Sequence, residues 1–188
     1  MAIDTARVEA AVAEILAAIG EDPARPGLVE TPRRVAEAYA DYFAGVGADP
    51  GAVLADAIPG ESGELVLVRD LTFRSMCEHH LLPFLGTAHV AYAPDTKIVG
   101  LGRIAEVVNL IAARPQLQER LTDEIADALS RALAPHGVLV VIDAVHGCVS
   151  ARGPRQPNAS TVTIAARGSL ADPAARHEVM ALISGAAS

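Results

Sequence analysis

Residues 64–80 read ELVLVRDLTFRSMCEHH, and this stretch joins a strand pattern to a row of side chains that can bind a metal. The residues from Leu65 to Phe73 are mostly apolar or β-branched, which predicts a strand. Cys77, His79 and His80 follow within seven residues of its end. We therefore expect a strand that leads into a chemically active turn.

The sequence on either side predicts the fold class. Further strands are expected at 87–92, 138–145 and 161–165, with a short one at 97–101. Between the two strand pairs, one helix is expected around 104–111 and a second from Pro115 to Leu133. A closing helix is expected over 171–183. The order strand–strand, helix–helix, strand–strand predicts an α+β domain with antiparallel hairpins.

The first third of the chain has a different, helical pattern. Apolar residues at helical spacing predict a helix over 4–19, and Thr31-Pro32 predicts the start of a second one, with Thr31 as N-cap and Pro32 at N1. We divide the chain into a helical arm, residues 1–63, and a sheet domain, residues 64–188. Each arm helix has a single apolar stripe, which must pack on the sheet domain or on a neighbouring subunit.

Composition excludes several classes of partner. The chain has 188 residues, of which 51% are hydrophobic, and a net charge of −8. An acidic surface argues against a nucleic-acid or membrane-surface binder, but a small anionic ligand needs only a few local cations. Lys97 is the one lysine beside 14 arginines, and arginine suits planar recognition of phosphate. Without a signal-peptide pattern or a long apolar run, we expect a cytoplasmic protein with reduced thiols.

Both cysteines lie beside histidines. Cys77 and His80 have a Cys-x-x-His spacing, and His146-Gly-Cys148 follows a long apolar strand. Because residues i and i+2 of an extended chain point the same way, we expect His146 and Cys148 to share a face. Sulfur and nitrogen ligands together favour zinc.

Three interpretations of these residues stay open at this level. The cysteines can be small core residues without a metal. A structural zinc would need four protein ligands, the fourth being His79 or His146. A catalytic zinc would need three protein ligands and a water, which leaves two histidines for acid–base work.

Longer motifs resemble the GTP cyclohydrolase I family. The resemblance covers roughly residues 28–183, in the expected order. The matching segments are SMCEHH (75–80), LLPF (81–84), AHVAY (88–92), RPQLQERLT (114–122), HGC (146–148), ARG (151–153) and TVT (161–163), with ETPxR at 30–34.

The resemblance implies a fold, a reaction and an assembly. The fold would be the tunnelling fold, an antiparallel four-stranded sheet with two helices on one face. The reaction would convert GTP and water to 7,8-dihydroneopterin triphosphate and formate, the first step toward folate and other pterins. The assembly would be a homodecamer of two pentamers, with active sites between subunits.

The family's functional residues fall on matching positions. The zinc ligands fall on Cys77, His80 and Cys148, and the zinc would lower the pKa of the attacking water. His146 is the candidate that protonates purine N7, and His79 the candidate that handles protons during ring opening and deformylation, since imidazoles titrate near neutrality.

The resemblance also implies a guanine site at the start of the second central helix. Glu119 would accept hydrogen bonds from guanine N1–H and the exocyclic amine, which selects guanine over adenine. Leu117 and Gln118 flank it, with backbone contacts expected. The alternative for Glu119 is an ordinary first-turn charge, which helices favour in any case.

The phosphate-binding positions depart from the family pattern. Where the family commonly reads G-L-S-K-x-x-R, residues 100–106 read GLGRIAE, so Gly102 loses a hydroxyl and Glu106 reverses a charge. The remaining candidates for the triphosphate are Arg34, Arg103 and Arg152. Either Glu106 pairs with an arginine in a rearranged site, or the preferred substrate differs.

These departures leave alternatives to the full reaction. One is a divergent paralogue with altered phosphate recognition, or one that stops at the formamidopyrimidine. The other is a non-catalytic, zinc-stapled nucleotide-binding subunit.

Overall fold

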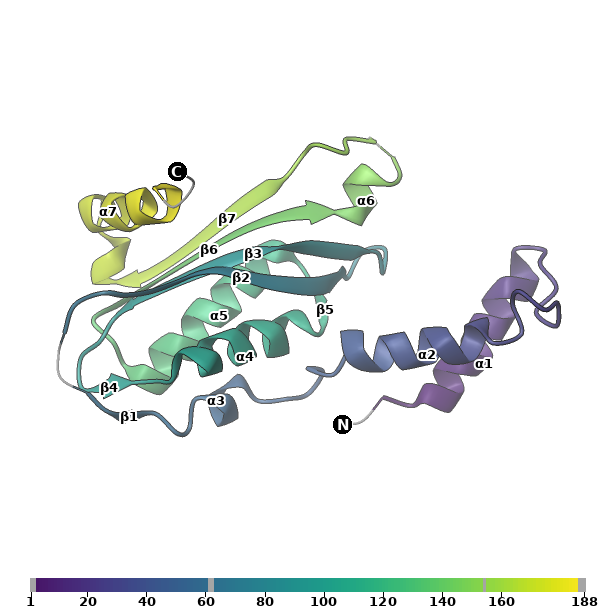
Figure 1. Cartoon of the computed structure of the whole chain (residues 1–188), viewed down its shortest axis with the longest axis horizontal. Coiled ribbons are helices and arrows are strands. Elements are labelled where there is room, and N and C mark those ends of the chain that lie inside the picture. The colour runs from purple at the N-terminus through teal and green to yellow at the C-terminus, as the bar shows by residue number, and fades with distance from the viewer. Residues whose placement is uncertain (1–2, 61–62, 154, 186–188) are drawn as a thin grey trace.

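The computed structural model describes residues 3–60, 63–153 and 155–185, and its centre is a five-stranded sheet (Figure 1). The strand order is β5-β2-β3-β6-β7. Four long strands pair antiparallel, and the two-residue β5 pairs parallel with the end of β2. The bounds are β2 Val66–Cys77, β3 Pro83–Ala93, β5 Pro115–Gln116, β6 Gly137–His146 and β7 Thr161–Gly168.

Two helices cover one face of this sheet, α4 (Leu101–Ala112) and α5 (Gln118–Leu133) (Figure 1). Their apolar stripes and the inward side chains of the strands form the main core, which is aliphatic apart from Phe73, Phe84, Tyr92 and Cys77. The predicted order of strands and helices, with antiparallel pairing, is confirmed. The structure therefore has the α+β class that the pattern predicts.

Helix α5 begins later than predicted. Pro115 and Gln116 pair with Met76 and Cys77 as β5, so the helix starts at Gln118 instead of Pro115. Burial of the apolar positions after Gln118 fixes the helix, whereas Pro115 and Gln116 pair with β2 at the edge of the sheet. The difference matters because β5 brings the start of α5 beside Cys77.

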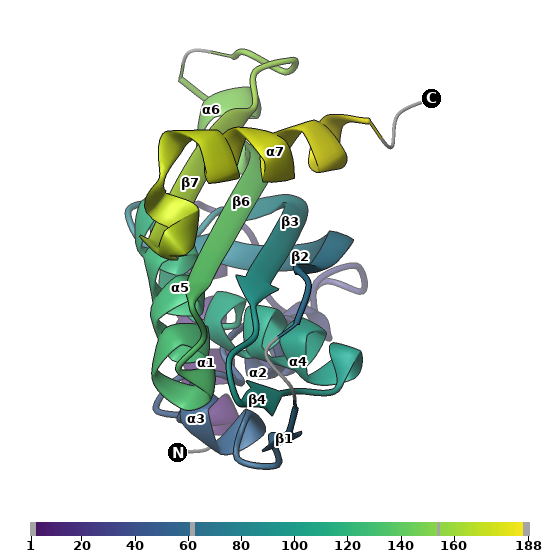
Figure 2. The ribbon, with the colours of Figure 1, turned by 90° about the vertical axis from the view of Figure 1, so that its left-hand side faces the viewer.

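The opposite face of the sheet is only partly covered. Helix α7 (Pro173–Ser184), preceded by the 3₁₀ turn η1 (Ser169–Ala171), lies across one end of that face (Figure 2). It forms a second, smaller core with Ala91, Leu139 and Val141. Toward the other end, Leu85, Val145 and Val162 stay exposed.

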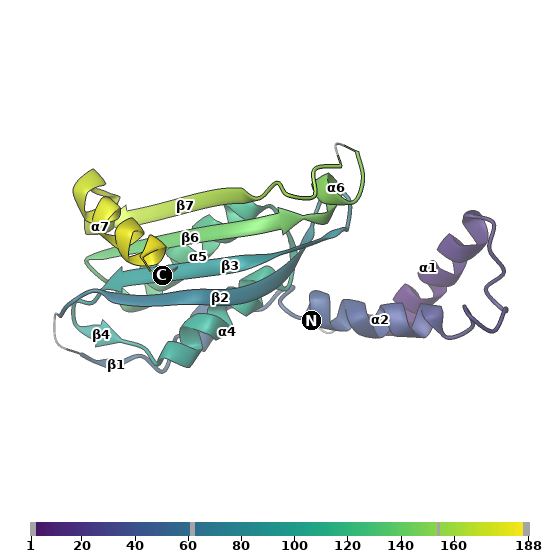
Figure 3. The same cartoon turned by 45° about the horizontal axis from the view of Figure 1, so that its top comes forward.

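The N-terminal helices project away from the sheet. Helices α1 (Thr5–Ala18) and α2 (Thr31–Tyr42) pack side by side beyond one end of the sheet (Figure 3). Helix α1 has no buried residue, and Ile15 and Ile19 are exposed. Thr31 is already helical, with Glu30 at the N-cap and no side-chain capping bond, so the predicted Thr31 cap is wrong.

The residues between the arm helices and β2 pack on the sheet domain. Helix α3 (Pro50–Val53) precedes Leu54, which is 1% exposed within the main core. Strand β1 (Ile58–Pro59) pairs antiparallel with β4 (Lys97–Ile98). Of the described helices, none combines the length and apolar character needed to cross a membrane.

Candidate metal centre

Three of the predicted metal ligands lie together. One ligand atom each from Cys77, His80 and Cys148 lies within 4.8 Å of the other two. Zinc binds sulfur at about 2.3 Å and nitrogen at about 2.0 Å, so ligand atoms around one tetrahedral ion lie about 3.5–3.8 Å apart. Two thiols and an imidazole are a donor set that zinc prefers. The residues present therefore fit zinc if their ligand atoms close in by up to about 1 Å.

A tight turn places Cys77 and His80. Cys77 is the last residue of β2, and its backbone N–H donates to the carbonyl of Leu82 at 2.9 Å. The N–H of Leu81 donates back to the Cys77 carbonyl at 2.9 Å, and Leu81 has a φ of 49°. Because both bonds close on Cys77, its thiol and the His80 ring are presented from the same turn.

Cys148 arrives by a different route from the one predicted. Strand β6 ends at His146, and α6 (Gly147–Ser150) is a single helical turn, so the expectation of an extended chain through Cys148 is wrong. A Cβ on Gly147 would lie 2.8 Å from the carbonyl oxygen of Pro83, which begins β3. The absence of a side chain at Gly147 thus lets the turn pack on β3.

The thiols share one electrostatic environment. Burial raises the pKa of Cys148 above its ordinary value, and the neighbouring Cys77 raises it further, while Arg152 lowers it. The Cys148 thiol therefore resists ionisation unless a cation stands beside it. A divalent cation would supply that charge.

His146 lies beside this group but is held by other residues. Its ring stacks on Phe84, with centroids 4.6 Å apart and an angle of 9° between the planes. Its Nε2 lies 2.6 Å from Oε1 of Gln118. Burial lowers the pKa of His146, and the charge of Glu119 opposes this shift. Among the described residues, the candidate metal group includes neither His146 nor His79.

The start of α5 lies close to His146. Glu119 is exposed and near enough to act on His146 electrostatically, and Leu117 is half-buried. The side chain of Gln118 is instead buried against β6 and β7. His79 is exposed, with its ring centroid 6.3 Å from that of His80.

The sequence interpretation missed an ion pair that joins two motifs. Arg120 of α5 pairs with Glu78, which lies between Cys77 and His79. Its Nε also donates to Oε1 of Gln116 at 2.9 Å. The pair ties the metal turn to the first turn of α5. The only indication of this ion pair in the sequence was the opposite charge of Glu78 and Arg120, each of which lies within a motif of the family.

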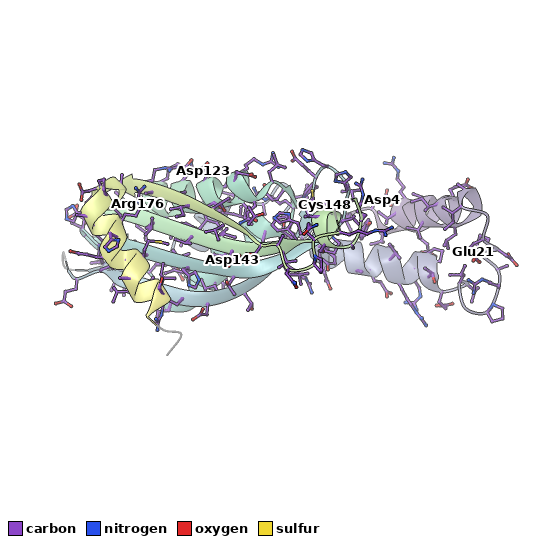
Figure 4. The ribbon with its side chains drawn as sticks, turned by 90° about the horizontal axis from the view of Figure 1, so that it is seen from above. Asp4, Glu21, Asp123, Asp143, Cys148 and Arg176 are labelled. Carbon is purple, nitrogen blue, oxygen red and sulfur yellow. The ribbon has the colours of Figure 1, made fainter. Side chains whose placement is uncertain are left out.

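We call the end of the sheet with Cys77, Pro83 and His146 the metal end, and the end where α4 begins the far end. Figure 4 shows Cys148 at the metal end and Arg176 of α7 at the opposite end. Helix α4 spans the two, because Ser75 Oγ donates to the carbonyl of Ala112, at its C-terminus, at 2.7 Å. At a rise of about 1.5 Å per residue, Arg103 lies about 14 Å from Ala112 along that helix.

The predicted phosphate-binding arginines do not come together within one chain. Arg103 is at the far end and pairs with Asp56 at 2.8 Å and with Glu106 at 2.7 Å. Arg34 is exposed on α2, whereas Arg152 is exposed but close enough to act on Cys148. Of the three, only Arg152 lies beside the metal group.

Comparisons with known proteins agree with this geometry. A family model described as GTP cyclohydrolase I matches residues 8–184. GTP cyclohydrolase 1 of Leifsonia xyli is 62% identical over 96% of this chain and 95% of its own. That of Rhodopirellula baltica is 52% identical over 99% of this chain and 82% of its own.

Among solved structures, the archaeosine synthase QueF-Like in the apo form covers 57% of this chain and 97% of its own, with a TM-score of 0.48 and 18% identity. The family match and the antiparallel sheet with two helices on one face together identify the α+β tunnelling fold. By the extent of the family match and the identity to curated relatives, the chain belongs to the GTP cyclohydrolase I family of enzymes.

Proposed function

We propose that this enzyme hydrolyses and rearranges GTP to 7,8-dihydroneopterin triphosphate and formate in a zinc-dependent reaction. The observation that supports this most is the group of Cys77, His80 and Cys148, with His146 beside it. Three protein ligands leave a zinc ion one open position, as catalytic zinc sites do. A structural site would close that position with a fourth side chain.

Cys77, His80 and Cys148 would hold the ion. When bound, zinc acts as a Lewis acid that makes water a nucleophile near neutral pH, which attack on purine C8 requires. Cys77 is buried and Cys148 is half-buried, so bulk water has little access to the metal group from the side of the two thiols. The exposed His80 side leaves room for the substrate base.

The neighbouring groups divide the remaining work. His146 donates a proton to N7 of the base as C8 becomes tetrahedral, and His79 handles protons during ring opening and deformylation. Glu119 accepts from guanine N1–H and the exocyclic amine, with the backbone of Leu117 and Gln118 beside it. The electrostatic influence of Glu119 on His146 supports this arrangement, since one purine must reach both.

The triphosphate would be bound by arginines of two subunits. Arg152 lies on the metal side of its own chain, whereas Arg103 lies at the far end, about 14 Å away along α4. A neighbouring copy would bring its Arg103 and Arg34 to the metal end. This requirement supports a homo-oligomer, which we propose to be a decamer of two pentamers, acting in the cytoplasm.

The direct test is incubation of the protein with GTP and Zn²⁺, with formate and the dihydropterin chromophore followed in parallel. The proposed reaction releases both at the same rate after an initial phase. Formate without the chromophore, or a formamidopyrimidine alone, would contradict it. Analytical ultracentrifugation of the same sample tests the decamer.

One observation favours a second candidate, altered recognition of the phosphate chain. Arg103 already has two carboxylate partners, Asp56 and Glu106. These two carboxylates cancel the positive charge of Arg103 and repel a phosphate chain, which weakens the attraction of this position for a triphosphate. Steady-state kinetics with GTP, GDP, GMP and guanosine separates the candidates. A clear preference for GTP would rule out the altered substrate.

A further inference from the structure

Gln118 is the best-connected polar side chain near the metal end. It is the first residue of α5 and is 2% exposed. Its Nε2 lies 2.7 Å from the carbonyl oxygen of Thr161, 3.1 Å from that of Ile142 and 3.1 Å from Oγ1 of Thr163. Carbonyl oxygens only accept, so these contacts fix the amide nitrogen on the side of β6 and β7. If the Gln118 amide were rotated by 180°, its oxygen would lie against the carbonyl oxygens of Ile142 and Thr161, which repel it.

Two threonines reinforce this orientation. The hydroxyl of Thr122 donates to the backbone carbonyl of Gln118 at 2.7 Å. Thr122 Oγ1 also lies 2.6 Å from Thr163 Oγ1, so the hydrogen in that contact comes from Thr163. Thr163 is then left with lone pairs that accept from the Gln118 amide. The bonds run in one direction around a closed ring, Gln118 to Thr163 to Thr122 and back to Gln118.

The amide oxygen of Gln118 is consequently aimed at His146. It lies 2.6 Å from Nε2, and an amide oxygen has no hydrogen to give. Nε2 must therefore carry the hydrogen, which makes Nδ1 the unprotonated nitrogen of the neutral ring. Stacking on the fully buried Phe84 fixes the plane of the same ring. Both the tautomer and the orientation of His146 are thus set by its neighbours.

We propose that Gln118 is a positioning residue that holds His146 in the Nε2–H form and leaves Nδ1 as the atom that exchanges a proton with the substrate. The catalytic part of this inference rests on the proposed function; the tautomer does not. It gives the Gln118 side chain a role apart from guanine binding, which falls to Glu119 and the backbone. As the imidazolium, the ring gives its Nδ1 proton to N7 of the base and returns to the neutral Nε2–H form, while the Nε2–H bond to Gln118 stays intact.

The first experiment reads the tautomer without turnover. Solid-state NMR of zinc-loaded protein labelled with ¹⁵N-histidine, at a pH where the ring is neutral, distinguishes Nε2–H from Nδ1–H. The His146 signals are assigned by their loss in His146→Ala. We expect the Nε2–H form in the unmodified protein and a mixture of both forms in Gln118→Met. An Nδ1–H ring in the unmodified protein, or an unchanged tautomer in Gln118→Met, would overturn the proposal.

The second experiment separates positioning from substrate binding. Loss of a residue that orients a functional group through a hydrogen bond typically costs about 10–100-fold. We expect Gln118→Met to lower kcat with GTP by that factor, with KM and zinc content nearly unchanged. A raised KM with unchanged kcat would instead mean that the side chain binds GTP. If the unmodified protein does not turn over GTP, the proposed function fails and the NMR result still decides the tautomer.

Matched variants control for simple damage to the core. Gln116→Met removes an equally buried amide two residues away, whose contacts are Ile111, Arg120 and Glu124, and should leave the His146 signals unchanged. Thr163→Val opens the hydrogen-bonded ring, and Thr163→Ser keeps its hydroxyl. If Gln118→Met does not fold, the unmodified protein decides, because an Nδ1–H ring there overturns the proposal. The carbonyls of Ile142 and Thr161 still hold the amide nitrogen in Thr163→Val, so both Thr163 variants should keep the Nε2–H form. A mixed tautomer in both would mean that damage to the core, and not the Gln118 amide, sets the ring, and would overturn the proposal.

Discussion

The two ends of the sheet hold their polar residues in different ways. At the metal end, His146 and Gln118 are bound by buried hydrogen bonds and by stacking on Phe84. At the far end, Arg103 has only exposed ion-pair partners. Buried polar groups must be satisfied within the protein and so have fixed geometry, whereas exposed pairs rearrange at little cost. We therefore expect the chemistry that needs fixed geometry at the metal end, and at the far end a charged side chain that rearranges to meet the substrate.

Removal of a thiol should have the largest effect and should be confined to the metal end. We expect Cys148→Ala to lose zinc, because only two of the three grouped ligands would remain, and turnover to fall to background. Metal analysis together with formate release measures both. Glu106→Gln is the matched far-end change and should keep its zinc. Equal zinc content in the two variants would contradict the claim that zinc is bound at the metal end.

Loss of His146 should separate chemistry from metal binding. His146→Ala is expected to retain zinc, because its ring is bonded to Gln118, and to lower kcat by about 10²–10⁴-fold, as loss of a general acid does. Measurements of zinc content and of the single-turnover rate distinguish a role in chemistry from a role in metal binding. A variant without zinc would show that His146 is a ligand.

At the far end the expected effect is on KM. Arg103→Met removes a charged hydrogen-bond donor that we expect to bind phosphate. A hydrogen bond of this kind is worth about 1.5–3 kcal/mol. Part of that loss is offset, because Arg103 no longer has to leave Asp56 and Glu106 when GTP binds. We expect KM for GTP to rise about tenfold while kcat changes little. Guanosine lacks the phosphates, so its kinetics serve as the control. An equal change for both compounds would place Arg103 outside the phosphate site.

The smallest of the expected effects is on stability. Adding a side chain to a glycine should destabilise the protein at the metal end and not at the far end. A Cβ at Gly147 meets the Pro83 carbonyl, whereas one at Gly102 meets nothing within 4 Å. We expect Gly147→Ala to destabilise the protein by about 1–3 kcal/mol through overpacking. Gly102→Ala should be neutral or gain less than about 1 kcal/mol of helix stability. Thermal melting of the two variants side by side tests this, and a lower melting temperature for Gly102→Ala would contradict it.

Prediction from sequence succeeded where periodicity carries the information. The apolar run before His146 and the stripe from Leu121 to Leu133 predict β6 and most of α5, because burial of one face requires that spacing. It failed at Pro115 and Cys148, where pairing with a distant strand or packing on Pro83 decides the local backbone. Such contacts join residues far apart in the chain and leave no local pattern.

The sequence by itself determined the α+β class, the family and the residue types that can bind zinc, because apolar period and motif spacing are local properties of the chain. The tertiary structure alone decided that Cys77, His80 and Cys148 meet, that Gln118 faces His146 rather than solvent, and that Arg103 lies at the far end with Asp56 and Glu106. The physical reason is that strand pairing brings residues 77 and 148 together across β3, and a hydrogen bond exists only once both its partners have been placed.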